Sequence, residues 1–152
     1  MKNQLVVFGL ANEQYGVDIA TVESIITLQT ITRIPQAPQF VEGVTNLRGH
    51  ILPVIDLRRR FGLPPAEPTK ATRIVVVEID GNTVGMVVDA VSEVLGVSEE
   101  AIEPLSPLVN TVDSAFINGI VKVGERLIIL LDLRKTLTAQ EALELLAMPV
   151  VA

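Results

Sequence analysis

The stretch VVFGLANEQYGVDIATVESII, from Val6 to Ile26, recurs as VVVEIDGNTVGMVVDAVSEVL, from Val75 to Leu95. Each copy begins with a β-branched run, passes a turn, and continues through a second run that carries Gly16 or Gly85. Both copies then reach matching second halves, FVEGVTNLRGHILPVIDLRRRFGL and FINGIVKVGERLIILLDLRKTL. Because an internal repeat constrains the whole architecture, we expect two similar halves.

Apolar runs predict equivalent strands in the two halves. We expect strands at residues 5–10, 73–79, 50–57 and 126–133. Asp80-Gly81 is a strong hairpin signal between two such runs. Because proline cannot donate to a ladder, Pro53 should lie at a sheet edge, a strand start or a bulge.

After each glycine the apolar spacing changes from that of a strand to that of a helix. The spacing predicts a short helical segment in each half, with Asp18 as an N-cap in the first. The apolar positions are Ile19, Val22 and Ile26 in the first half and Val88, Val91 and Leu95 in the second.

About five short strands per half, without a long crossover, predict two small closed or nearly closed barrels. Lobes of about 65 residues have marginal cores alone, so they should pack across a pseudo-twofold. We place the lobes at 1–68 and 69–137 of one domain spanning 1–152, and strands could exchange between them. The proline-rich segment 57–72 connects them, and residues 138–148 read as an amphipathic C-terminal helix.

Composition and charge argue against several classes of function. The chain has no cysteine and one histidine, which excludes thiolate chemistry and a multi-histidine metal site. A net charge of −6 argues against nucleic acid, and Arg58-Arg59-Arg60 reads as a solvated strand end. No apolar run approaches the roughly 18 to 20 residues of a membrane span, and no signal peptide is evident. We therefore expect a cytosolic protein that neither inserts into membranes nor binds nucleic acid.

No catalytic template is present. Phosphate-binding glycine loops are absent, and His50 stands in no catalytic motif. Asp56 and Asp132 occupy equivalent repeat positions, so a structural role is simpler, such as ending a strand or pairing with the arginine two residues on. Tyr15 is expected in packing. The repeated glycines at 43 and 119 suggest a positive φ at a short helix end.

The repeat provides an internal control for function. Asn46-Leu47-Arg48-Gly49 in the first half corresponds to Lys122-Val123-Gly124-Glu125 in the second. The barrel therefore does not require the polar residues of the first half. Asn46 and Arg48 become candidates for contact with a partner.

GVTNLRGHILPVIDLRRRFGL, with YGVDIATVESI and ITRIPQAPQFVEG before it and VGMVVDAVSEVL after it, resembles the CheW family of chemotaxis coupling proteins. The resemblance runs from Gln4 to about Leu146. It implies a mainly β fold of two intertwined, pseudo-twofold-related five-stranded SH3-like barrels. It also implies a non-enzymatic cytoplasmic adaptor, without a cofactor, recruited to membrane-associated receptor arrays. Its partners would be the cytoplasmic tip of methyl-accepting chemotaxis proteins and the regulatory domain of the histidine kinase CheA.

The same resemblance suggests site residues. Those matching receptor-binding positions are Asn46, Arg48, Val22, Ser24 and Val94. Ser24 stands where the enterobacterial member has an acidic residue. Gly43 and Leu108 match kinase-binding positions, and Leu108 replaces an aromatic residue.

Two alternatives stay open at this point. One is a CheW-like scaffold of a chemosensory pathway other than chemotaxis, with a different receptor and kinase. The other is a small-ligand-binding or enzymatic β-barrel that uses Asp56 or Asp132 in a concave pocket. Partner capture would distinguish the first alternative, and a perturbed carboxylate in a pocket would support the second.

Overall fold

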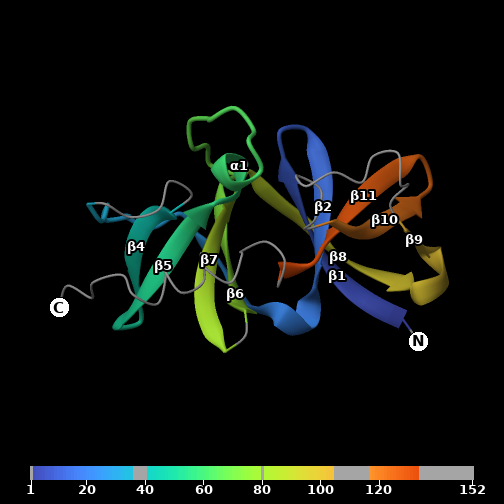
Figure 1. Cartoon of the computed structure of the whole chain (residues 1–152), viewed down its shortest axis with the longest axis horizontal. Coiled ribbons are helices and arrows are strands. Elements are labelled where there is room, and N and C mark those ends of the chain that lie inside the picture. The colour runs from blue at the N-terminus through green and yellow to red at the C-terminus, as the bar shows by residue number, and fades with distance from the viewer. Residues whose placement is uncertain (1, 36–40, 80, 105–116, 134–152) are drawn as a thin grey trace.

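The structure is a computed structural model that describes residues 2–35, 41–79, 81–104 and 117–133. Strands dominate these residues, which confirms the mainly β prediction (Figure 1). In the first half the elements are β1 (Lys2–Leu10), β2 (Glu13–Asp18), η1 (Ile19–Thr21), β3 (Val22–Thr27), β4 (Val41–Leu47), β5 (His50–Asp56) and α1 (Leu57–Arg60). In the second half they are β6 (Arg73–Ile79), β7 (Asn82–Val88), β8 (Ala90–Ser98), η2 (Glu99–Ala101), β9 (Ile102–Glu103), β10 (Ile117–Val123) and β11 (Arg126–Leu131).

The described strands form two sheets, and each sheet mixes the two halves of the chain. The six-stranded sheet has the order β8-β1-β2-β11-β10-β9, and the five-stranded sheet has the order β3-β6-β7-β5-β4. Figure 1 shows the two sheets side by side, with the blue strands β1 and β2 next to the orange strands β10 and β11. The lobe boundaries and the closure of each sheet into a barrel stay predictions.

The exchanged strands pair through equivalent residues of the sequence repeat. Leu130 of β11 lies opposite Gly16 of β2 in a parallel pair, and the equivalent Val54 of β5 lies opposite Gly85 of β7. The antiparallel pair of β1 with β8 likewise corresponds to that of β6 with β3. The two halves are therefore related by an approximate twofold, and each completes the sheet of the other.

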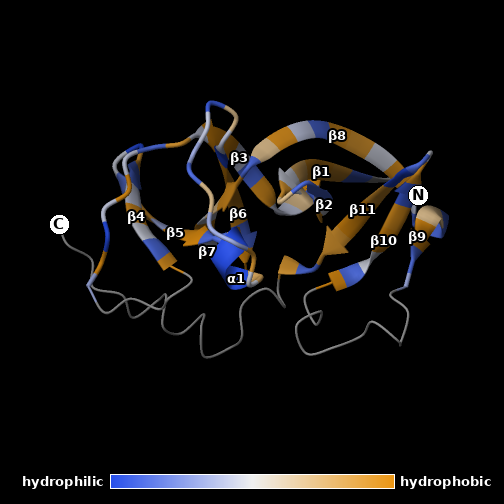
Figure 2. Ribbon diagram, turned by 90° about the horizontal axis from the view of Figure 1, so that it is seen from above, coloured by the Kyte–Doolittle hydropathy of each residue, from blue (hydrophilic) through white to orange (hydrophobic). Residues whose placement is uncertain are grey.

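The largest buried cluster draws on both sheets. It contains Phe8 and Tyr15 from the six-stranded sheet and Ile55 and Met86 from the five-stranded sheet. Each sheet also has a smaller cluster of its own, around Val7 in one and Val76 in the other. Figure 2 shows hydrophobic residues along the strands of both sheets. Since burial of apolar surface is the main stabilising term, the sheets should fold as one cooperative unit.

Tyr15 is the aromatic centre of this shared cluster. The residue is 8% exposed, and its ring stacks on Phe8 with centroids 6.0 Å apart. The ring centroid of Phe61 lies 5.9 Å from that of Tyr15, in a tilted arrangement. Burial, and then the nearby Glu13 carboxylate, raise the pKa of Tyr15. The packing role predicted for this residue is confirmed.

The predicted helical segments are wrong except for a 3₁₀ turn at Ile19–Thr21. Residues 22–27 form β3, and residues 90–98 form β8. A single 3₁₀ turn at Ile19–Thr21 and a register shift between Val22 and Ser24 disturb the strand alternation, so the apolar spacing imitates a helix. The N-cap is confirmed, because the Asp18 carboxylate accepts a hydrogen bond of 2.9 Å from the Ala20 N–H.

Two further expectations about the end of β5 need correction. Arg58-Arg59-Arg60 lies in the helix α1 and not at a strand end, because Asp56 caps that helix by accepting a 3.0 Å hydrogen bond from the Arg58 N–H. Pro53 lies in β5, an interior strand of its sheet. Its missing N–H is tolerated because the pairing of β5 with β7 begins only at Val54.

The C-terminal helix predicted at 138–148 lies outside the described residues. Among the residues that the structure does describe, no helix has the length and apolar character needed to span a bilayer.

Candidate functional site

The hairpin between β4 and β5 presents the polar residues singled out by the repeat. Leu47 and His50 are paired at its end, so Arg48 and Gly49 form a two-residue turn. Their φ angles are 53° and 84°, and positive φ at both positions is the pattern of a type I′ turn. The turn follows the right-handed twist of the two strands and ends them sharply.

Asn46 braces this turn. Its side-chain Oδ1 accepts a hydrogen bond of 2.9 Å from the Gly49 N–H. Both Asn46 and Arg48 are exposed to solvent. Within the described parts of the chain, no hydrogen bond or ion pair engages the Arg48 guanidinium. The hairpin therefore offers a cation whose backbone is fixed and whose charge is available.

The second hairpin shows what Arg48 costs. There Val123 and Arg126 are paired, and Gly124, with φ of 61°, stands at the position of Arg48. Glu125, at the position of Gly49, has no positive φ, so this turn is not of type I′. Glycine adopts this conformation freely, whereas a residue with a Cβ loses about 1–2 kcal/mol. Positive φ at a residue with a Cβ is not confined to Arg48, since Ala11 and Asn12 in the β1–β2 turn have φ angles of 50° and 69°.

Ser24 and Val22 lie on the strand β3, not on a helix. Val22 packs against the shared central cluster, so it supports the core. Ser24 is half-buried, and its equivalent in the second half is Glu93. Glu93 forms a 2.5 Å ion pair with Arg126, whose equivalent is His50 beside Arg48. In the five-stranded sheet, however, Ser24 lies on the edge strand β3, and β6 and β7 separate it from the β4–β5 hairpin that carries Arg48.

Val94 lies in the other sheet. Its side chain is 53% exposed on β8, where the residue pairs with Val6. The five receptor-binding candidates are thus not all close in the fold. The hairpin joins Asn46 to Arg48, while Val22, Ser24 and Val94 come from two strands in different sheets.

Gly43, a kinase-binding candidate, has a clear structural role. It lies at a bulge in β4, with φ of 152°, and a Cβ there would stand 2.2 Å from the Thr32 carbonyl oxygen. Thr32 and Val44 exchange two backbone hydrogen bonds of 2.8 and 2.9 Å at this close approach. The short helix end predicted for Gly43 is wrong, since the residue is within a strand. Leu108, the other kinase-binding candidate, lies outside the described residues.

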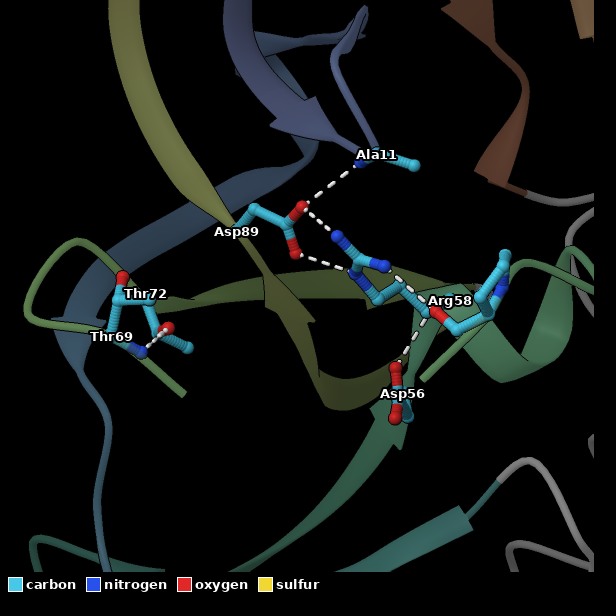
Figure 3. A network of polar contacts seen from close by, with 7 residues as sticks. Ala11, Asp56, Arg58, Thr69, Thr72 and Asp89 are labelled. Carbon is cyan, nitrogen blue, oxygen red and sulfur yellow. Dashed lines mark hydrogen bonds and ion pairs between the residues drawn. The ribbon is translucent and has the colours of Figure 1, made fainter. Parts of the chain in front are cut away.

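The sequence did not predict an ion pair that links the two sheets. Arg58 of α1 donates from Nε and an Nη to the two carboxylate oxygens of Asp89, at 2.8 and 2.6 Å (Figure 3). Asp89 follows β7, and it also accepts a 2.9 Å hydrogen bond from the Ala11 N–H in the β1–β2 turn. The hydrogen bonds from Arg58 hold the pKa of Asp89 below its usual range. The predicted pairing of Arg58 with Asp56 is wrong for the guanidinium, which donates to Asp89, while Arg58 donates to Asp56 through its backbone N–H.

Among the described residues, three of the four exposed large apolar side chains, all except Val94, were also missed, although the repeat could have revealed them. Ile25 on β3 and Val94 on β8 are equivalent, and so are Ile51 on β5 and Leu127 on β11. The same outward positions are apolar in both halves. Strand alternation, once β3 and β8 are recognised as strands, identifies all four.

Two hollows on the described part of the surface include carboxylates in their lining. One, of about 590 Å³, lies between the sheets and includes Asp18, Glu78 and Asp132 in its lining. The other, of about 540 Å³, includes Asp56 and Arg59, whose Nε lies 3.7 Å from the Asp56 Oδ2. Among the described residues, no cluster of histidine, aspartate and glutamate could hold a metal ion.

Comparison with known proteins adds the family. A model of the CheW-like domain matches residues 4–141. The chemotaxis protein CheW of Klebsiella aerogenes is 39% identical over 138 residues, which cover 91% of this chain and 83% of that protein. CheW of Bacillus subtilis is 34% identical over 139 residues, covering 91% and 89%. The crystal structure of the scaffolding protein TtCheW from Thermoanaerobacter tengcongensis superposes with a TM-score of 0.84 at 45% identity, over 93% of this chain and 91% of that one. The motif resemblance is confirmed, and the chain belongs to the CheW family.

Proposed function

We propose that this protein is a non-enzymatic adaptor that couples methyl-accepting chemoreceptors to the histidine kinase CheA in chemotaxis signalling. The exposed Arg48 guanidinium on its braced turn is the observation that carries the proposal. The names of the relatives, chemotaxis proteins CheW, and of the solved scaffolding protein support it. The adaptor acts in the cytoplasm, at membrane-associated receptor arrays, and uses no cofactor.

Receptor recognition would rest on the hairpin. A receptor tip is a helical hairpin, and docking a helix requires apolar contact together with a few polar anchors. Arg48 supplies such an anchor and pairs with a carboxylate on the receptor. Ser24 on the edge strand β3 would add a polar contact, and exposed Val94 offers apolar contact on the other sheet. Val22 contributes indirectly, because it packs on the central cluster.

Kinase recognition would use other positions. The regulatory domain of CheA has the same fold by resemblance, so similar strands would pack against one another through exposed aliphatic residues. Leu108 is proposed as a direct contact. Gly43 acts by keeping the geometry of β4, since a side chain there would collide with Thr32. Each contact is modest alone, and assembly into arrays would strengthen both.

The variant Arg48→Glu tests the proposed binding to the receptor. The variant should keep the wild-type circular dichroism spectrum and lose at least about tenfold in affinity for a purified receptor cytoplasmic fragment. Lys122→Glu is the matched control, because it places the same charge reversal on the equivalent, second hairpin. Wild-type receptor binding by folded Arg48→Glu would refute the proposal.

Titration with the CheA regulatory domain tests the proposed binding to the kinase, and saturable 1:1 binding is expected. The same purified fragments separate the chemotaxis role from that of a scaffold in another chemosensory pathway. Binding only to a non-chemotaxis receptor and kinase would favour the second role, while the adaptor mechanism itself would stand.

A further inference from the structure

We propose that Asn46 is a positioning residue, which acts on receptor binding through Arg48 without touching the receptor. The inference rests on the proposed function of the Arg48 hairpin. It replaces the direct receptor contact expected for Asn46 with a role inside the hairpin. Its basis is the single side-chain bond that spans the turn.

The geometry of that bond is specific. Asn46 precedes the turn by two residues, and its Oδ1 accepts the N–H of Gly49 on the far side of Arg48, at 2.9 Å. The bond closes a small ring that includes the Arg48 backbone. Because asparagine side chains favour such local bonds to the backbone, the ring holds the turn in one conformation. The direction in which Arg48 leaves the hairpin is thereby fixed.

Arg48 needs this support because its backbone is strained. Its φ of 53° is disfavoured for any residue with a Cβ. Without the Asn46 hydrogen bond, one interaction that offsets the backbone strain at Arg48 is lost, and the turn keeps this conformation less firmly. An arginine on a loosened turn would have to be ordered when the receptor binds, and that ordering lowers affinity.

The second hairpin lacks both the acceptor and the arginine, and its turn is of another type, since Glu125 has no positive φ at the position of Gly49. Lys122 stands at the position of Asn46, and a lysine side chain has no acceptor for the N–H of Glu125. That turn carries Gly124 at the position of Arg48, and glycine needs no brace at φ of 61°. The acceptor and the strained arginine therefore occur together in one half and are absent together from the other.

A double-mutant cycle tests the proposal, with titration calorimetry of the full-length protein against a receptor cytoplasmic fragment. Asn46→Ala should weaken receptor binding about fivefold, the equivalent of one ordinary hydrogen bond. In an Arg48→Gly background, Asn46→Ala should change affinity by less than about twofold, because the residue it positions is gone. An equal loss in both backgrounds would mean that Asn46 contacts the receptor directly, and the proposal would fall.

Amide exchange of the free protein supplies a readout independent of the receptor. Exchange at the Gly49 amide should accelerate in Asn46→Ala and return to the wild-type rate in Asn46→Asp, which keeps an acceptor oxygen. Asn46→Asp should also bind the receptor fragment within about threefold of wild type. Restored protection without restored binding would identify the Asn46 amide N–H₂ as the contact, against the proposal.

Different results would contradict the proposed function of the hairpin and the positioning role of Asn46. If Arg48→Glu binds the receptor normally, the proposed function of the hairpin fails, whatever Asn46 does. If Arg48→Glu loses binding but Asn46→Ala does not, only the positioning role fails. Circular dichroism of each variant confirms that the comparison is made between folded proteins.

Discussion

Arg58 and Asp89 form a bidentate ion pair that links the helix after β5 to the end of β7. Asp89 also accepts the Ala11 N–H from the six-stranded sheet, so one carboxylate holds elements of both sheets. Their side chains are 17% and 36% exposed, so solvent screens the pair only in part. This contact stands at the junction where the two halves exchange strands.

Asp89→Asn should destabilise the protein by about 1–2 kcal/mol at neutral pH, a value reduced for the partial exposure of the pair. The folded pKa of Asp89 is lowered, chiefly by the Arg58 hydrogen bonds, so its contribution is complete above the usual carboxyl range. It is lost as the pH falls through the lowered folded pKa. Urea denaturation at neutral and acidic pH should show the gap between wild type and variant closing in acid. Glu99→Gln is the control, and a gap that widens in acid would contradict the assignment.

Gly43→Ala should cost about 3 kcal/mol or more, because the new Cβ would stand 2.2 Å from the Thr32 oxygen and the φ of 152° disfavours a side chain. Gly96→Ala is the matched control, since a Cβ there meets nothing within 4 Å. Its effect should stay within about 0.5 kcal/mol. Thermal unfolding of the two variants decides the comparison. Equal stabilities would mean that the bulge of β4 adapts freely, and any kinase defect of Gly43→Ala would then be a direct contact effect.

Arg48→Gly should raise stability by about 0.5–1 kcal/mol. The strain of about 1–2 kcal/mol is released, and the extra freedom of glycine in the unfolded chain opposes about half of that gain. Gly124→Ala, at the equivalent turn, should instead lower stability by about 1 kcal/mol. Chemical denaturation measures both changes. A loss of stability in Arg48→Gly would show that the arginine makes a stabilising contact within the free protein.

Ser24→Glu combined with His50→Arg should create the ion pair that Glu93 and Arg126 make in the other half. Their coupling energy should be about 0.2–1 kcal/mol at low salt and should shrink as salt is added, as expected for a partly exposed pair. A double-mutant cycle by urea denaturation measures it. Zero coupling at low salt would show that the approximate twofold does not extend to these side chains.

Much of the fold could be predicted because it depends on local patterns. Runs such as Arg73–Ile79 are β-branched, turns carry glycine, and the repeat doubles every signal. The error at β3 and β8 had a local cause too. A register shift inserts one residue into each strand, between Val22 and Ser24 in β3 and between Val91 and Glu93 in β8, so the apolar spacing resembled a helical one. A 3₁₀ turn precedes β3 as well.

The candidate site, too, could be predicted from the sequence only in part. Asn46 and Arg48 were identified because the second half lacks them, and that comparison needs no coordinates. The role of Asn46 could not be separated from that of Arg48, because its bond to Gly49 is a matter of turn geometry. Val22 and Val94 match family positions alike, yet one packs on the core and the other is exposed.

By itself, the sequence determined that the chain is mainly β, that its halves are equivalent, and that one hairpin differs from its counterpart. These properties follow from side-chain size, turn chemistry and repetition along the chain. Only the tertiary structure decided that the halves exchange strands, that the largest core lies between the sheets, and that Arg58 pairs with Asp89 rather than Asp56. The physical reason is that such contacts join residues far apart in the chain, and no local pattern specifies which distant partner a strand or a charge will meet.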